Sequence, residues 1–280
     1  MLPRDLLLQA SRHPQELAGL IDRAEQALRT WEPVWSDFLA AEVLEEALAR
    51  LGDLAELALE SAGGWPQSER RRLCLQRREL ASAGDSAGAD GAPGIGAPGT
   101  SAAPEAWAPL RGLAIAGNFL FDPAEARDMR QALVAQGASP GAIGDIWIQG
   151  DRGAQLVVTP ELAQTLDQTT AQVRSVEVHL EALPLEQLQI PAQRLPRQLT
   201  TVEASLRLDA VASAGFGLSR NRMADLIRSG AVRINWQPVT SPSRELALGD
   251  RVRLEGRGEL ELLEVQLTKR DRWRLVLQRR

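Results

Sequence analysis

Cysteine and histidine are almost absent from this chain of 280 residues. Cys74 is the only cysteine, so no disulfide can form within the chain, and the sequence does not open with the charged and apolar regions of a secretion signal. With His13 and His179 as the only histidines, a metal site or a Cys–His catalytic pair has almost no ligands to be built from. We therefore expect a reducing compartment, with no metal, no cofactor and no small-molecule substrate.

Long apolar runs are also missing. The most apolar stretch, residues 112–121, is far shorter than the roughly 20 residues that a membrane helix needs, so we predict no transmembrane segment and a cytoplasmic location. Hydrophobic residues make up 44% of the chain and charged residues 25%, which is typical of a globular protein. The length favours two or three domains.

Only one part of the chain has a net positive charge. Residues 200–280 contain fifteen basic and ten acidic side chains, a net charge of +5, whereas the whole chain has a net charge of −5. A basic segment in an otherwise acidic protein indicates a module that binds a polyanion such as RNA.

A stretch of small residues divides the sequence. In residues 81–106, 21 of the 26 residues are Ala, Gly, Pro or Ser, which bury too little surface to fold, so we interpret this stretch as a flexible insertion. Before it, residues 1–80 form a mostly helical N-terminal region, with helices predicted at 14–30 and 38–51 and short strands at 55–59 and 73–76.

The order of elements in residues 107–190 predicts a ferredoxin-like (RRM-like) βαββαβ domain. The expected strands are 113–116, 146–148, 156–158 and 176–180, and the expected helices are 123–137 and 161–173. Trp147 is the only aromatic residue on these strands, so the sheet lacks the set of aromatic side chains on which such RNA-binding domains stack bases.

Residues 199–280 begin with an extended segment, followed by two short helices, 206–214 and 219–228. Ser219 is a suitable N-cap for the second helix, and Gly230 is suited to ending it. Strands follow at 232–235, 251–254, 260–267 and 273–277, and the apolar alternation slips between Leu262 and Leu263 as a β-bulge would require. The chain as a whole is therefore predicted to be α+β.

The second of these helices carries two cations where the helix dipole disfavours them. Arg220 and Arg222 lie in its first turn, where acidic residues are preferred. An anion bound by the first-turn N–H groups and both guanidinium groups would compensate. Arg228 and Arg233 extend the same positive surface.

These residues resemble the S-four (αL-type) RNA-binding domain. The motifs that carry the resemblance, in order, are Ser205-Leu206-Arg207-Leu208-Asp209, Gly217-Leu218-Ser219-Arg220, Leu226 to Asn235, and Leu248-Gly249-Asp250. The resemblance implies binding of structured RNA, ribosomal or transfer RNA, by Arg207, Ser219, Arg220, Arg222, Arg228, Arg233 and Asn235. One departure is Trp236, where family members often have glycine.

The upstream motifs resemble the YlmH-type family, which combines these three parts. They are Ser36 to Leu39, Gly63 to Leu73, Ala126-Arg127-Asp128 and Ile143 to Ile146. Asn118 to Pro123 and Gly144 to Trp147 are similar to the cyanobacterial and plastid branch, the photosystem II S-four domain proteins. This branch implies association with the ribosome, a link to photosystem II subunits and a place at the periphery of the thylakoid membrane.

Two other functions compete with a non-catalytic RNA-binding protein. Trp31, Trp35, Trp65 and Trp107 could anchor a partner of a photosystem II assembly factor, although core packing explains Trp31 and Trp35 more simply. Arg207-Leu208-Asp209 resembles a pseudouridine synthase motif, but here Asp209 lies inside the S-four module and is better interpreted as the partner of an arginine. We therefore predict no enzyme and no catalytic residue. The run Arg70-Arg71-Arg72 is typical of a solvated turn, with an RNA contact as the alternative.

Overall fold

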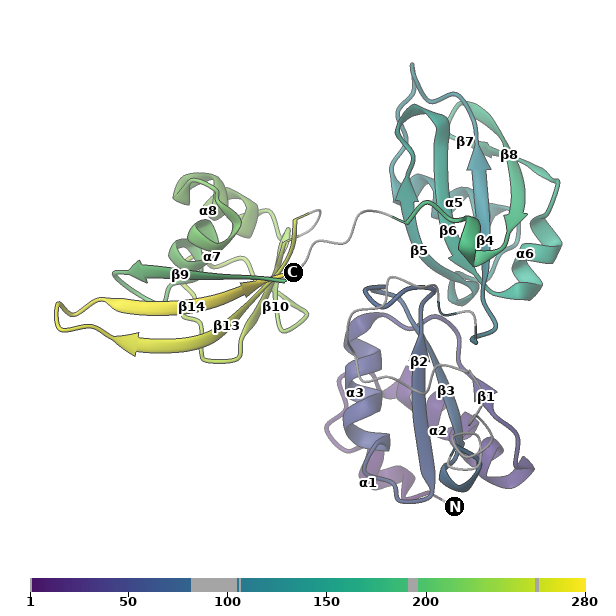
Figure 1. The fold of residues 1–280 in the computed structure, drawn as a ribbon, viewed down its shortest axis with the longest axis horizontal. Coiled ribbons are helices and arrows are strands. Elements are labelled where there is room, and N and C mark those ends of the chain that lie inside the picture. The colour runs from purple at the N-terminus through teal and green to yellow at the C-terminus, as the bar shows by residue number, and fades with distance from the viewer. Residues whose placement is uncertain (1, 82–104, 106, 191–195, 255–256) are drawn as a thin grey trace, which may run out of the picture. The chain divides into compact units, whose positions relative to one another are not determined.

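The chain folds into two compact units, Met1–Pro191 and Ala192–Arg280 (Figure 1). The structure is a computed structural model that describes residues 2–81, 105, 107–190, 196–254 and 257–280. The predicted insertion 81–106 lies outside the described residues except for Ala81 and Glu105, so its flexibility stays a prediction. None of the described helices is long and apolar enough to cross a membrane.

The first part of unit 1 packs helices against a small antiparallel sheet with the strand order β1-β3-β2. Its core consists of apolar side chains from α2, α3 and both long strands, including Leu20, Ile21, Leu51 and Leu73. The elements are α1 (Arg4–Leu8), α2 (Pro14–Thr30), β1 (Val34–Trp35), α3 (Ala41–Leu51), β2 (Leu57–Ala62) and β3 (Arg72–Arg77). Helix α3 starts at Ala41, three residues later than the predicted start at Phe38. Phe38 is instead buried, and its N–H donates to the carbonyl of Gly141 at 2.7 Å.

The second part of unit 1 is a five-stranded antiparallel sheet with the order β5-β6-β4-β8-β7. Apolar side chains of α5 and α6 pack with those of the strands in one core. The elements are β4 (Arg111–Ala116), α5 (Ala126–Ala135), η1 (Pro140–Ala142), β5 (Ile143–Ile148), η2 (Gly150–Arg152), β6 (Gly153–Val158), α6 (Pro160–Leu166), β7 (Thr170–Val173), β8 (Val176–Leu183) and η3 (Leu185–Gln187).

The helix predicted at 161–173 is wrong in its second half. The chain leaves the helix at Asp167, and Gln168 takes a left-handed φ of 58°, which turns the backbone back toward β8. Ala171 and Val173 are buried while their neighbours are exposed, so this alternating segment forms β7 instead. The sheet thus has one strand more than the βαββαβ arrangement that the sequence predicts.

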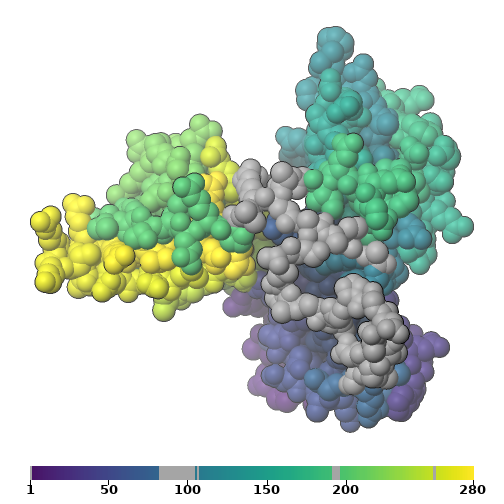
Figure 2. All heavy atoms as spheres, in the orientation of Figure 1, coloured from purple at the N-terminus to yellow at the C-terminus, as the bar shows by residue number. Residues whose placement is uncertain are grey.

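Unit 2 is a six-stranded sheet with the order β11-β10-β12-β13-β14-β9 and two helices on one face (Figure 1). Its elements are β9 (Arg197–Glu203), α7 (Leu208–Phe216), α8 (Arg220–Arg228), β10 (Val232–Ile234), β11 (Gln237–Pro238), β12 (Arg251–Leu254), β13 (Gly258–Leu267) and β14 (Trp273–Arg279). The pairing of β13 with β14 shifts between Leu262 and Glu264, so the predicted bulge is confirmed. Figure 2 shows the far end of this hairpin, in yellow, extending beyond the rest of the unit.

The run Arg70-Arg71-Arg72 is not a solvated turn, and an RNA contact by these residues stays a prediction. Arg70 donates to the carbonyls of Phe38 at 3.0 Å and Ile143 at 3.2 Å, and so links the two parts of unit 1. Arg72 donates to the carbonyls of Ser36 and Pro109 at 2.7 and 2.9 Å. The prediction fails because the side chains serve buried backbone acceptors rather than water.

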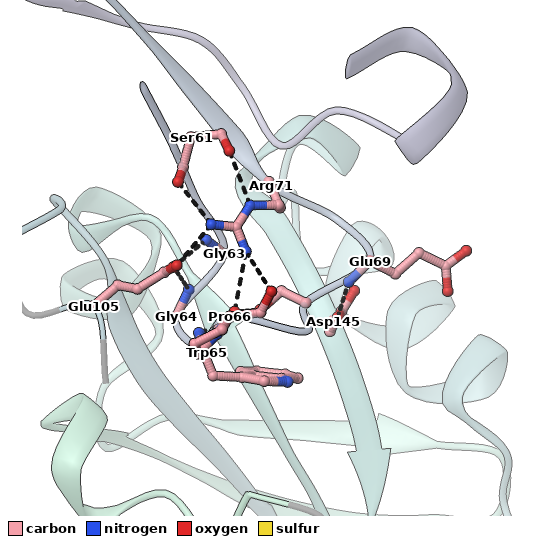
Figure 3. A network of polar contacts seen from close by, with 10 residues as sticks. Ser61, Gly63, Gly64, Trp65, Pro66, Glu69, Arg71, Glu105 and Asp145 are labelled. Carbon is pink, nitrogen blue, oxygen red and sulfur yellow. Dashed lines mark hydrogen bonds and ion pairs between the residues drawn. The ribbon is translucent and has the colours of Figure 1, made fainter. Parts of the chain in front are cut away.

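Arg71, the middle residue of this run, pairs with Glu105 at 2.6 Å, and both side chains are largely buried (Figure 3). The Glu105 carboxylate also accepts from the N–H groups of Gly63 and Gly64 at 2.7 and 3.0 Å, while Arg71 donates to the Ser61 carbonyl at 2.7 Å. Glu105, near the end of the stretch 81–106, therefore binds this point of the chain to the turn that follows β2.

Close to this pair, the Asp145 carboxylate accepts from the N–H groups of Glu69 and Arg70 at 2.7 and 2.9 Å (Figure 3). Burial raises the pKa of Asp145, and these bonds oppose the rise. Cys74 lies on β3, in the first part of the unit, where burial raises the pKa of its thiol to about 11 and so disfavours the reactive thiolate at neutral pH.

We predict that Glu105→Ala lowers the free energy of unfolding of the full chain by about 3 kcal/mol, because it leaves Arg71 without its buried partner. Arg127→Ala is the matched control: Arg127 pairs with Glu125 at 3.1 Å with both side chains mostly exposed, and this variant keeps Glu125 as the N-cap of α5, so we expect a loss below about 0.5 kcal/mol. Urea unfolding of both variants measures the difference. Equal losses would show that burial of the Arg71 pair adds no stability.

Candidate nucleic-acid interface

Helix α8 begins as the sequence predicts. The Ser219 hydroxyl caps the helix by accepting from the N–H of Arg222 at 3.4 Å, and no acidic residue lies in the first turn. Met223 and Ile227 point into the core of unit 2, so the opposite side of the helix carries its polar residues at the surface. Gly230 follows with a φ of 79°, which suits the end of a helix.

Arg207 and Arg220 share one carboxylate. The Asp209 side chain, only 8% exposed, accepts from Arg207 at 2.9 Å and from Arg220 at 3.2 Å. Burial alone raises the pKa of Asp209, but the hydrogen bonds from the two arginines outweigh it and hold the pKa below its usual value. The positive charge of Arg220 at the start of the helix is thus balanced within the protein and requires no bound anion.

Arg222 differs from Arg220. It is exposed, and its side chain has no hydrogen bond or ion pair with any residue that the structure describes. Arg228 pairs with Asp225 at 2.9 Å, and both side chains are mostly exposed, so this pair contributes little to stability. Of the two first-turn arginines, Arg222 is therefore the one whose positive charge the helix dipole disfavours and no described carboxylate balances.

Arg233 and Asn235 lie beyond α8, on β10 and directly after it. Arg233 is exposed and stands opposite Arg253 of β12. Asn235 is partly buried: its amide donates to Asp250 at 2.8 Å and accepts from the N–H of Arg251 at 3.0 Å. Asn235 therefore joins the turn after β10 to the start of β12, a structural role that the sequence analysis did not foresee.

Arg251 and Arg253 were not among the contact residues predicted from the sequence. They alternate with the buried Val252 and Leu254 along β12, so both point to the face of the sheet away from the core, as Arg233 does. The alternation of arginine with apolar residues in 251–254 was the signal that could have found them.

The tryptophans of unit 1 divide into packed and exposed side chains. Trp147 packs edge-on against the buried Trp65, with ring centroids 4.9 Å apart, and donates to the Gln189 carbonyl at 2.9 Å. It is thus part of the interior of unit 1 rather than a platform for bases. Trp107 is 55% exposed. Trp31 is 53% exposed, so it is not the core residue that we expected.

Two segments of the chain match known families. Residues 12–80 match the family described as "YlmH, N-terminal", and residues 206–252, which contain α7, α8 and β10, match the S4 (S-four) domain. The chain is thus similar to YlmH proteins over residues 12–80 and to the S4 domain over residues 206–252. The S4 match spans the positions of all seven predicted contact residues, and it also includes the Asp209 pairs described above.

The chain is also similar to individual proteins. The "Ribosome-associated protein quality control protein P2" of Bacillus subtilis is 32% identical over 160 residues, which are 57% of this chain and 62% of that protein, less than two thirds of its length. A solved structure, "Cell division protein ylmH from Streptococcus pneumoniae", is 15% identical with a TM-score of 0.46, and the likeness covers 65% of this chain and 96% of that one. Neither name mentions photosystem II.

We predict that Asp209→Asn lowers the free energy of unfolding by about 1–3 kcal/mol, because the amide leaves two guanidinium groups without a buried carboxylate. Since the folded pKa of Asp209 lies below the unfolded value near 3.9, its contribution is present above that pH and disappears as the pH falls through the folded pKa. The gap between wild type and variant in urea unfolding should therefore narrow from pH 7 toward pH 3.

Asp225→Asn is the matched control in the same unit, because it removes an exposed carboxylate from Arg228. We expect a change below about 0.5 kcal/mol at pH 7. If the difference in unfolding free energy between wild type and Asp209→Asn stays constant from pH 7 to pH 3, this result would contradict the lowered pKa of Asp209.

Proposed function

We propose that this YlmH-like chain is a non-catalytic, ribosome-associated protein that binds structured RNA, ribosomal or transfer RNA, through unit 2. The observation that carries the proposal is the S4 match over the segment in which Arg222 lies exposed in the first turn of α8. First-turn N–H groups and a guanidinium group together suit the phosphate groups of RNA.

The distribution of arginine contacts supports this choice of unit. In unit 1, Arg70 and Arg72 donate to backbone carbonyls, and so do Arg77 and Arg130. In unit 2, Arg207 and Arg220 donate to the buried carboxylate of Asp209, and Arg228 donates to the exposed carboxylate of Asp225. Unit 2 also has the basic balance noted in the sequence, so phosphate groups meet more available positive charge there.

Association with the ribosome is supported by the name of the Bacillus relative, which matches part of this chain. The absence of catalysis is supported by Asp209, the only residue that suggested an enzyme: both of its carboxylate oxygens accept from arginines. The ferredoxin-like interpretation of the five-stranded sheet is supported by its strand order, with β7 as an added edge strand. The photosystem II and thylakoid link rests on the motifs at 118–123 and 144–147 alone and stays a prediction.

We predict that Arg222→Ala in the full chain weakens binding to a transfer RNA and to a fully paired RNA duplex, and lowers the slope of log K against log salt by about 1. The reason is the loss of one phosphate contact with its released counterion. Fluorescence anisotropy at several salt concentrations measures both quantities.

Arg127→Ala is the matched control, because Arg127 also lies exposed in the first turn of a helix, but in unit 1. It should leave affinity and slope unchanged. Equal effects of the two variants, or no salt-dependent binding of either RNA by the wild type, would overturn the proposed function.

A further inference from the structure

Trp236 occupies a backbone position that suits glycine. It is the second of two residues between β10 and β11, and the pairing of Ile234 with Gln237 makes this a two-residue hairpin loop. Asn235 and Trp236 have φ values of 47° and 70°, the left-handed pair of a type I′ turn, in which Asn-Gly is preferred. A bulky side chain there costs free energy, and such strain gathers at functional sites.

The Trp236 ring lies beside two cations. The guanidinium carbons of Arg253 and Arg251 are 5.3 and 5.6 Å from its centroid, within the range of cation–π attraction. Both arginines belong to β12 and point away from the core, so the ring lies on the face of the sheet opposite to α7 and α8.

Charge on this face favours an anion. Arg233 stands directly opposite Arg253, and like charges in that relation destabilise a sheet. On the other side of β12, Glu259 and Glu261 stand opposite Arg253 and Arg251, and Glu261 also pairs with Arg280 at 2.9 Å. Among the residues of this face that the structure describes, three arginines thus belong to β10 and β12 next to Trp236, while the two carboxylates belong to β13.

We propose that Trp236 stacks an unpaired RNA base and that Arg233, Arg251 and Arg253 bind the phosphate groups that flank it. Every base has a π-face, so an aromatic ring among cations suits an unpaired nucleotide without selecting its sequence, whereas a base inside a duplex is not available to the ring. This inference rests on the proposed function, and it adds that the structured RNA presents a bulged or looped-out nucleotide.

The test compares two RNA probes with the full chain: a fully paired duplex and the same duplex with one bulged adenosine. We expect the wild type to bind the bulged duplex roughly 5- to 100-fold more tightly, the range given by one stacked base. Trp236→Gly should abolish this preference and leave the salt slope unchanged, because it removes stacking but no charge. Glycine suits the turn, so the variant should fold, and Trp236→Phe should restore part of the preference.

Trp31→Gly is the matched control. Trp31 also has a left-handed φ, 61°, and also contacts an arginine, with the guanidinium carbon of Arg77 4.0 Å from its ring, but it lies in unit 1. It should keep the preference. Equal binding of both duplexes by the wild type, or a preference that survives Trp236→Gly, would overturn this inference and leave the proposed function intact. Failure to bind either duplex would overturn both.

Discussion

Unit 1 depends on guanidinium groups that donate to backbone carbonyls. A buried carbonyl needs a donor, and arginine offers five N–H groups in one rigid plane. Arg70 joins Phe38 to Ile143, while Arg130 reaches Ile143 and Gly144 from α5. Segments that lie far apart in the sequence and outside a common sheet are thereby held together. Removing one such donor would leave several carbonyls without a partner at once.

The same use of arginine separates the electrostatic roles of the two units. Burial lowers the pKa of Arg72 and of Arg130, both of which donate to backbone carbonyls. In unit 2, by contrast, Asp209 holds Arg207 and Arg220 at the surface, and Arg222 lies exposed next to them. Unit 1 thus uses several arginines to bind backbone carbonyls and keeps others, such as Arg127, at its surface, whereas in unit 2 two arginines share one buried carboxylate.

Local signals predicted the parts of the fold that depend on neighbouring residues. The apolar period of α2, the Ser219 cap of α8 and the bulge in β13 were all readable from a few adjacent positions. The inward direction of Arg70 and Arg72 was not, because their acceptors lie 32 to 73 positions away. Strand β7 was not predicted for a related reason. The helix before it ends where Gln168 adopts a left-handed φ, and no glycine marks that position in the sequence.

The candidate site was predicted in outline but not in its internal contacts. Sequence spacing brought Arg207, Arg220 and Arg222 to one region, and it suggested that Asp209 pairs with an arginine. It gave no way to know that one carboxylate serves two of these arginines, since that depends on how α7 packs against α8. Arg251 and Arg253 were not predicted as site residues, because they are marked by the alternation of a strand and not by a charge at a helix end.

The shared carboxylate also has a kinetic consequence. Asp209 orders the side chains of Arg207 and Arg220 during folding, before any partner arrives. Immobilising such a side chain at the moment of binding costs about 0.5–1.5 kcal/mol, and this cost has already been met for both. Pre-ordered contacts act mainly on dissociation, whereas an unrestrained cation such as Arg222 contributes to long-range attraction during encounter. In the proposed RNA complex, Arg207 and Arg220 would therefore act mainly on the dissociation rate, and Arg222 would act mainly on the association rate.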